Sequence, residues 1–225
     1  MYRNWYAFHM DELESLLEEL KANPKVQSII LFGSQARGDA RPESDIDLII
    51  VCNETKRGVE EHNCQMFELV YVTEADAVQF YNAHKDNCVR TWESAKILFD
   101  RDGSAGRLQE VARRIKETGK EKPSRDALQH AKFDAVDFMR ALTEKCATDE
   151  TTALFLLYGK LPRLVETYYS VRGLWIPAPK RTLLNLKEID AILYGLIADV
   201  YRPDIRAYEK IEITKKIIEH VFAGA

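Results

Sequence analysis

The feature that most constrains the fold is a pair of apolar segments separated by a short polar stretch, within residues 25–51. The run Ile-Ile-Leu-Phe at 29–32 predicts a buried strand. Gly33 follows directly and permits a tight turn and a close approach of the backbone. After a polar loop, residues 45–51 continue as Asp-Ile-Asp-Leu-Ile-Ile-Val and predict a second strand. We therefore expect two strands of a sheet with a polar turn at one end.

Two aspartates, Asp45 and Asp47, stand two residues apart on the second predicted strand. Side chains on a strand alternate between its faces, so both carboxylates should point the same way, opposite to Ile46 and Leu48. Like charges on one face repel each other, and a divalent cation removes that cost. Magnesium takes one or two carboxylates together with substrate phosphates. The spacing therefore predicts that both aspartates are metal ligands.

The turn before the loop supplies groups that suit a phosphate. Ser34 follows Gly33 and is expected to open a short helix, where free backbone N–H groups attract phosphate and the hydroxyl adds a donor. A Walker-type loop is excluded, because no Gly-Lys-Ser/Thr sequence occurs. One loop thus offers hydrogen-bond donors for phosphate, and the next strand offers metal ligands. This combination indicates phosphoryl or nucleotidyl transfer, in which the protein mainly positions the reacting groups and neutralises their charge.

The string GSQARGDARPESDID at residues 33–47 resembles the signature of the DNA polymerase beta-like nucleotidyltransferase superfamily. It is most similar to the minimal and the antibiotic (aminoglycoside-type) nucleotidyltransferases, and the resemblance covers roughly the first half of the chain. It implies an α/β (α+β) fold, in which a nucleotidyltransferase domain with a mixed sheet is followed by an all-α helical-bundle domain. The alternative interpretation is an ordinary Gly33-Ser34 turn with Ser44-Asp45 as a strand-start cap.

The resemblance implies a third carboxylate on a neighbouring strand. Glu68 fits, because it is the only acid in the predicted strand 66–72. The alternative is an acid at an exposed sheet edge. Many minimal members carry aspartate at this place, so the role of the longer glutamate stays open between metal ligand and general base on the acceptor hydroxyl.

Two cations are candidates for nucleotide binding. Arg37 lies one turn after Ser34 and could reach phosphate or brace the loop. Lys180 follows the Pro-Ala-Pro sequence at 177–179, which stiffens its loop and could project the amine into a cleft between domains. A solvated surface lysine is the equal alternative.

The other elements follow from periodicity. The polar residues 119–124 contain no apolar member and mark a boundary, which gives a nucleotidyltransferase domain over 1–120 and a helical substrate-binding domain over 121–225. We expect a polar loop at 53–63. The first domain should hold helices at 10–20, 73–84 and 104–118 and strands up to 32, at 45–51, 66–72 and 95–99. The second should hold helices at 125–146, 151–171, 183–186, 189–201 and 205–222.

Composition limits the partners. The chain has 225 residues and a formal net charge of −4, which disfavours a broad basic surface for nucleic acid. No apolar run reaches the roughly 18 residues of a membrane span, and no signal peptide is evident. We therefore expect a cytoplasmic protein without a membrane partner. Its cysteines, which show no CxxC pair, should be reduced thiols: Cys52, Cys64, Cys88 and Cys146.

Together these features predict a magnesium-dependent nucleotidyltransferase, with two ions on Asp45, Asp47 and Glu68. Its substrates would be a nucleoside triphosphate, ATP in the first instance, and a small hydroxylated acceptor such as an aminoglycoside-like antibiotic, which implies antibiotic resistance. One alternative is a protein adenylyltransferase of toxin–antitoxin type, although such enzymes usually lack a large helical domain. Another is a nucleotide-binding pseudoenzyme, which the intact aspartates disfavour. Oligomeric state stays open, a homodimer included.

Overall fold

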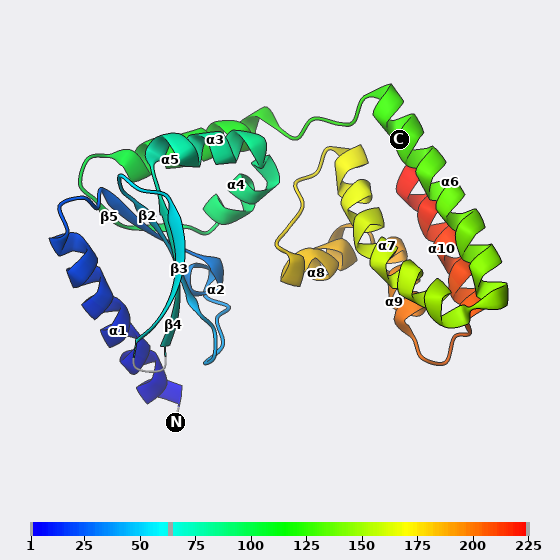
Figure 1. Cartoon of the computed structure of the whole chain (residues 1–225), viewed down its shortest axis with the longest axis horizontal. Helices are drawn as coiled ribbons and strands as arrows, with labels where there is room; N and C mark the ends of the chain where they lie inside the picture. Colours follow the sequence, from blue (N-terminus) through cyan, green and yellow to red (C-terminus); the bar gives the residue numbers. More distant parts are fainter. Residues whose placement is uncertain (1, 63–64, 224–225) are drawn as a thin grey trace. The chain divides into compact units, whose positions relative to one another are not determined.

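The computed structural model describes residues 2–62 and 65–223, with side chains from residue 12 onward. The chain divides into two compact units, Met1–Thr118 and Gly119–Ala225. The first unit holds all the strands of the described residues, and the second is helical throughout (Figure 1). This is the mixed α/β architecture followed by a helical region that the sequence predicts.

The first unit is built on a mixed five-stranded sheet in the order β3-β4-β2-β1-β5. Neighbouring strands are antiparallel except β2 and β4, which run parallel. The parallel pair sets Asp47 directly beside Glu68 in register. The strand bounds are Ser28–Phe32 for β1, Ile46–Val51 for β2, Lys56–His62 for β3, Gln65–Val72 for β4 and Lys96–Asp100 for β5.

One prediction about the sheet is wrong, because most of the stretch expected as a polar loop is strand β3. It pairs antiparallel with β4 from Lys56, opposite Tyr71, to His62, opposite Gln65. β3 lies at the edge of the sheet and most of its side chains are exposed, so it has no alternation of apolar and polar residues. Charged side chains are usual on such an edge. Asn63 and Cys64, which the predictions also included, lie outside the described residues.

Helices cover both faces of the sheet. Helix α1 lies on one face (Figure 1), where its leucines Leu13, Leu16 and Leu20 pack against alternate strand residues such as Leu48 and Leu69. The other helices of this unit are α2 (Gly33–Arg37), α3 (Glu74–Ala83), α4 (Lys85–Trp92) and α5 (Ser104–Thr118), and α1 itself spans Tyr2–Ala22. Helix α4 was not predicted. It follows α3 after the single residue His84, whose φ of −126° and ψ of 59° break the helix.

The second unit contains five helices within the described residues, with a core of fully buried leucines that includes Leu142, Leu157, Leu161 and Leu186. The N-cap side chains of Ser124, Asp149 and Asp190 each accept a bond from a backbone N–H of the helix that follows. The helices are α6 (Arg125–Thr148), α7 (Glu150–Arg172), α8 (Pro179–Ile189), α9 (Ala191–Tyr201) and α10 (Ala207–Phe222).

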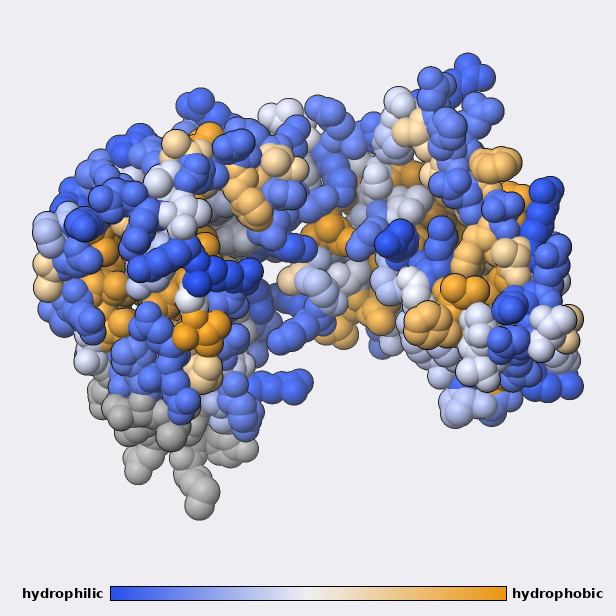
Figure 2. All heavy atoms as spheres, viewed as in Figure 1, coloured by the Kyte–Doolittle hydropathy of each residue, from blue (hydrophilic) through white to orange (hydrophobic). Residues whose placement is uncertain are grey.

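The surface of the helical unit is mixed, with hydrophobic side chains in patches among hydrophilic ones (Figure 2). Large exposed apolar side chains include Phe133, Phe155, Leu184 and Ile192. None of the helices in the described part of the chain combines the length and apolar character that crossing a membrane requires.

Candidate active site

The site begins at the turn between β1 and α2. Gly33 has a φ of +71°, and a Cβ built on it would lie 1.8 Å from Oδ2 of Asp47. Only glycine therefore lets this turn approach the aspartate so closely. The residue before it, Phe32, is extended and offers no side-chain cap to α2. The predicted phosphate-binding residues Gly33 and Ser34 thus begin a short helix beside Asp47, as the sequence indicates.

The structure brings the three predicted acids together. Asp45 directly precedes β2, Asp47 lies on β2 and Glu68 lies on β4. One carboxylate oxygen from each lies within 4.8 Å of the others. The intervening residue Ile46 and its register partner Phe67 belong to the core under α1, so Asp47 and Glu68 face the other side of the sheet. Their role as metal ligands stays a prediction.

The cluster is electrostatically unfavourable without a counter-charge. Burial, followed by the charges of Asp45 and Glu68, raises the pKa of Asp47 to about 7, while Arg37 acts in the opposite direction. The carboxylates of Asp45, Asp47 and Glu68 offer three hard oxygen donors close together. A divalent cation such as Mg²⁺ prefers such ligands, and its charge would offset the repulsion among the three groups.

Two arginines lie near the acids. Arg37 donates from Nε to both carboxylate oxygens of Asp39 at 3.2 and 3.3 Å, and its positive charge works to lower the pKa of Asp47. Arg57 on β3 forms an ion pair with Glu68. Sequence reasoning missed Arg57, because its segment was predicted as a loop. The available signal was the short separation from strand 66–72, which is typical of a hairpin.

The last predicted residue, Lys180, lies in the helical unit. It is exposed and occupies the first turn of α8, which begins at Pro179. The prediction of a loop lysine is therefore wrong, since the second proline starts a helix instead of stiffening a loop. Its contact with phosphate stays a prediction.

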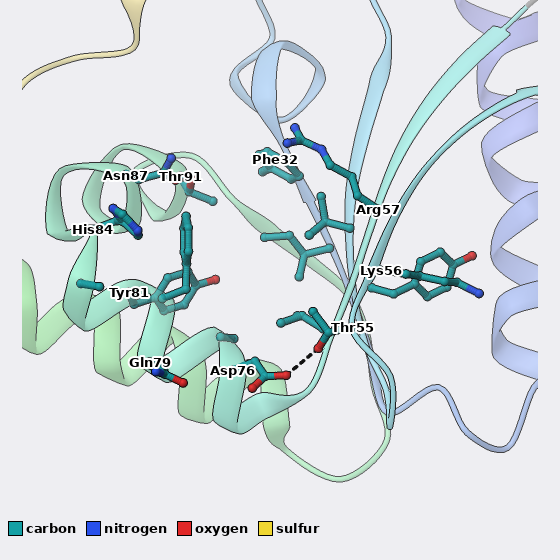
Figure 3. Close-up of a pocket in the computed structure, with 17 residues that line it drawn as sticks. Phe32, Thr55, Lys56, Arg57, Asp76, Gln79, Tyr81, His84, Asn87 and Thr91 are labelled. Atoms are coloured by element: carbon teal, nitrogen blue, oxygen red, sulfur yellow. Dashed lines mark hydrogen bonds between the residues drawn. The ribbon is translucent and has the colours of Figure 1, made fainter.

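A cavity of about 680 Å³ lies on the same face of the sheet as the acids, although none of the three acids is among its lining residues. Ile49 and Val70 line it, two residues beyond Asp47 and Glu68 on the same strands. The side chains of α3 and α4 form the opposite wall (Figure 3). The Gly33 turn and the acidic cluster are therefore in close contact, and the cavity lies on the same face of the sheet as the acids.

The family match agrees with this geometry, since residues 14–104 fit the model of the polymerase beta nucleotidyltransferases. Residues 14–104 form a nucleotidyltransferase domain of the polymerase beta family. The segment includes every site residue described above except Lys180, and it ends where α5 begins.

Known proteins resemble the chain over different lengths. A provisionally named protein adenylyltransferase of Methanocaldococcus jannaschii is 44% identical over 50 residues, which are 20% of this chain and 58% of that protein. The match therefore spans less than two thirds of that relative. The crystal structure of a nucleotidyltransferase-like protein from Exiguobacterium sibiricum shares the fold, with 14% identity and a TM-score of 0.52 over 93% of this chain and 73% of that one.

A more distant solved structure is the spectinomycin adenyltransferase of Enterococcus faecialis, determined with ATP and spectinomycin. It is 12% identical and covers 95% of this chain and 96% of its own, with a TM-score of 0.37. A likeness at this level supports no argument about the acceptor.

Proposed function

We propose that this protein is a magnesium-dependent nucleotidyltransferase that transfers a nucleoside monophosphate, AMP from ATP, to a hydroxyl group of a small molecule. The observation that carries the proposal is the closeness of Gly33 to an acidic cluster of Asp45, Asp47 and Glu68. A phosphate-binding turn and carboxylates that suit a cation are the two parts that nucleotidyl transfer needs. The family of residues 14–104 supports the same reaction class.

In this proposal the turn at Gly33 and Ser34 holds the triphosphate, and Arg37 contacts its outer phosphates. Asp45 and Asp47 hold the metal, with Glu68 as a third ligand or as the general base. Bound there, Mg²⁺ would neutralise the charge of the phosphates and orient the α-phosphate. An acceptor hydroxyl oxygen forms a bond to the α-phosphorus while the bond from that phosphorus to the β-bridging oxygen breaks. Pyrophosphate leaves, and the hydroxyl proton passes to a base.

The carboxylate of Glu68 has a partner on the neighbouring strand. Arg57 on β3 forms an ion pair with it in the structure. A carboxylate at this place can accept a proton from the acceptor hydroxyl or bind a cation. Arg57 therefore acts in the proposal as a positioning residue, which orients the Glu68 carboxylate until substrate and metal arrive.

The helical unit completes the proposal as the substrate-binding domain over residues 121–225, and the nucleotidyltransferase domain covers 1–120. The chain folds into two compact units with a division close to that boundary. Lys180, exposed at the start of α8, is the candidate that would contact phosphate from this domain.

A second candidate function is protein adenylylation. The 44% identity to the archaeal relative named for that activity favours it. The argument for a small acceptor is the helical unit with its own apolar core, because a chain that carries such a unit can supply an acceptor-binding surface itself.

The experiment compares Asp47→Asn with Asp134→Asn, a matched change at an exposed position on α6. Each protein is incubated with labelled ATP and magnesium, with hydroxylated small compounds in one arm and a cell lysate in the other. We expect label on a small compound, abolished by Asp47→Asn and kept by Asp134→Asn. Label found solely on lysate protein would favour protein adenylylation, and equal transfer by both variants would contradict the metal assignment.

A further inference from the structure

The cavity beside the acids has the size and composition of a small-molecule site. Its volume of about 680 Å³ falls within the range of roughly 300–1,000 Å³ that is usual for ligand pockets. Apolar side chains of the sheet, Ile49 and Val70, form its floor. The aromatic rings of Phe80 and Tyr81 come from α3 and lie 6.4 Å apart. Such surfaces bind flat, apolar ring systems.

Most of the polar side chains that line the cavity are neutral. Asn87 and Thr91 project from α4 towards the cavity (Figure 3), and the hydroxyl of Thr91 donates to Oδ1 of Asn87 at 3.3 Å. Among the described lining residues the one carboxylate is Asp76, and its Oδ2 already accepts a bond of 2.6 Å from Thr55. Two cationic side chains, Lys56 and Arg57, are also part of the lining.

This lining offers too few carboxylates to bind a polycation. Each ammonium group that leaves water needs a carboxylate or several oxygen acceptors, or it pays a large desolvation cost. Within the described lining, the cavity provides a single, already bonded carboxylate and adds the positive charges of Lys56 and Arg57. An aminoglycoside, which carries several ammonium groups, therefore does not fit here.

The position of the cavity indicates which substrate enters it. Its lining includes Arg57, which pairs with Glu68, and Phe32, which directly precedes the turn, but not the phosphate-binding candidates Gly33, Ser34 and Arg37. The cavity therefore reaches the acidic cluster through Arg57, the partner of Glu68, and the groups that would hold the triphosphate lie outside its lining. In-line displacement puts the attacking hydroxyl on the side of phosphorus opposite to the leaving pyrophosphate. The group next to Glu68 is then the acceptor.

We propose that this cavity binds the acceptor, and that the acceptor is a neutral alcohol or phenol with an apolar, ring-containing body. The inference rests on the proposed nucleotidyl transfer. The ring stacks against Phe80 and Tyr81, the rim of Asn87 and Thr91 bonds to polar substituents, and the hydroxyl points to Glu68. This acceptor class replaces the aminoglycoside-like compounds that the sequence suggests. The cavity binds the part of the acceptor that carries the reacting hydroxyl, so the proposed substrate-binding role of the helical unit is confined to the rest of a larger acceptor.

The test is a binding titration of the full chain with 2-naphthol, a neutral aromatic alcohol, followed by saturation-transfer NMR. It is run with and without magnesium and a non-hydrolysable ATP analogue, and kanamycin serves as the polycationic comparison. Phe80→Ala removes an exposed ring from the lining, and Thr91→Phe fills the space from the opposite wall. Phe133→Ala is the matched control, since Phe133 is equally an exposed helix phenylalanine and lies in the other unit.

We expect 2-naphthol to bind both alone and with the nucleotide analogue present. Phe80→Ala and Thr91→Phe should each weaken this binding about fivefold, and Phe133→Ala should leave it unchanged. Kanamycin should not compete. Displacement of 2-naphthol by the analogue would overturn the proposal in favour of a nucleoside pocket. Binding that neither lining variant changes would also overturn it, as would competition by kanamycin.

Binding of the ATP analogue is a separate measurement, and it tests the proposed function itself. The analogue's own binding is measured in the same titration, on the wild-type chain. If the analogue does not bind at any magnesium concentration, nucleotidyl transfer is contradicted, and the acceptor assignment falls with it. Binding of the analogue with loss of the 2-naphthol signal contradicts the acceptor assignment alone.

Discussion

The substitution Gly33→Ala tests whether the turn and the acidic cluster form one unit. Alanine at this position meets two penalties. Its φ of +71° lies in the left-handed region, which costs a residue with a Cβ about 1–2 kcal/mol. The new Cβ would also lie 1.8 Å from Oδ2 and 2.7 Å from Cγ of Asp47. Since such atoms rarely approach closer than 3.0 Å, the carboxylate has to move by more than 1 Å.

Gly38→Ala separates these two penalties. Gly38 has a φ of +82°, and a Cβ there meets no atom within 4 Å. Both variants should therefore lose about 1–2 kcal/mol of unfolding free energy from the backbone. Only Gly33→Ala should also displace Asp47, and a displacement of about 1 Å at a reacting centre can cost on the order of 10²-fold in rate.

The assays are urea unfolding for stability, Mn²⁺ binding by electron paramagnetic resonance, and the transfer rate. We expect Gly38→Ala to keep Mn²⁺ binding and transfer, whereas Gly33→Ala loses about 10²-fold in rate and binds Mn²⁺ more weakly. If the two variants bind Mn²⁺ and transfer equally well, Gly33 is only a turn residue and its contact with Asp47 has no functional meaning.

Further outcomes follow from other parts of the chain. If Glu68 is the base, Glu68→Gln should lower turnover by about 10²–10⁴-fold and change ATP binding little, which steady-state kinetics and titration would separate. Burial works to raise the pKa of Asp190, but bonds from Leu193 N–H, His220 and Tyr168 outweigh it and lower that pKa. Asp190 therefore contributes its full share of the unfolding free energy above the pKa that its carboxyl has in the unfolded chain. This contribution is lost as the pH falls through the lower pKa of the folded state. The unfolding free energy of Asp190→Asn should therefore fall less steeply with decreasing pH below about pH 4 than that of the wild type. Limited proteolysis should cut first within 119–123, and an intact chain after prolonged digestion would contradict a flexible connection there.

The site residues that the sequence predicts are those whose signal is local. The spacing of Asp45 and Asp47 fixes their common face through the strand period alone. Gly33 follows an apolar run, so its place at a turn needs no distant information. Glu68 could be predicted because its strand is apolar on both sides of it, as the buried neighbours Phe67 and Leu69 show.

Strand β3 and helix α4 were not predicted, because they are defined by contacts between residues distant in sequence and not by a local pattern. Strand β3 is mostly exposed, so its hydrogen bonds to β4 define it and Arg57 went unnoticed with it. Helix α4 buries Cys88 and Val89, which are adjacent in sequence, and this gives no helical period to recognise. The cavity itself joins strand and helix residues that are far apart in the chain.

The connection from β4 to β5 forms a part of the cavity wall that is separate from the strands of the acids. The acids stand on or beside the central strands β2 and β4, whereas the outer wall of the cavity belongs to α3 and α4, which link β4 to β5. Residues on these helices can change without altering the strand register that sets Asp47 beside Glu68. Under the acceptor assignment proposed above, substitutions in this one helical segment would change which acceptor is bound, while the acids that carry the reaction keep their places on the strands.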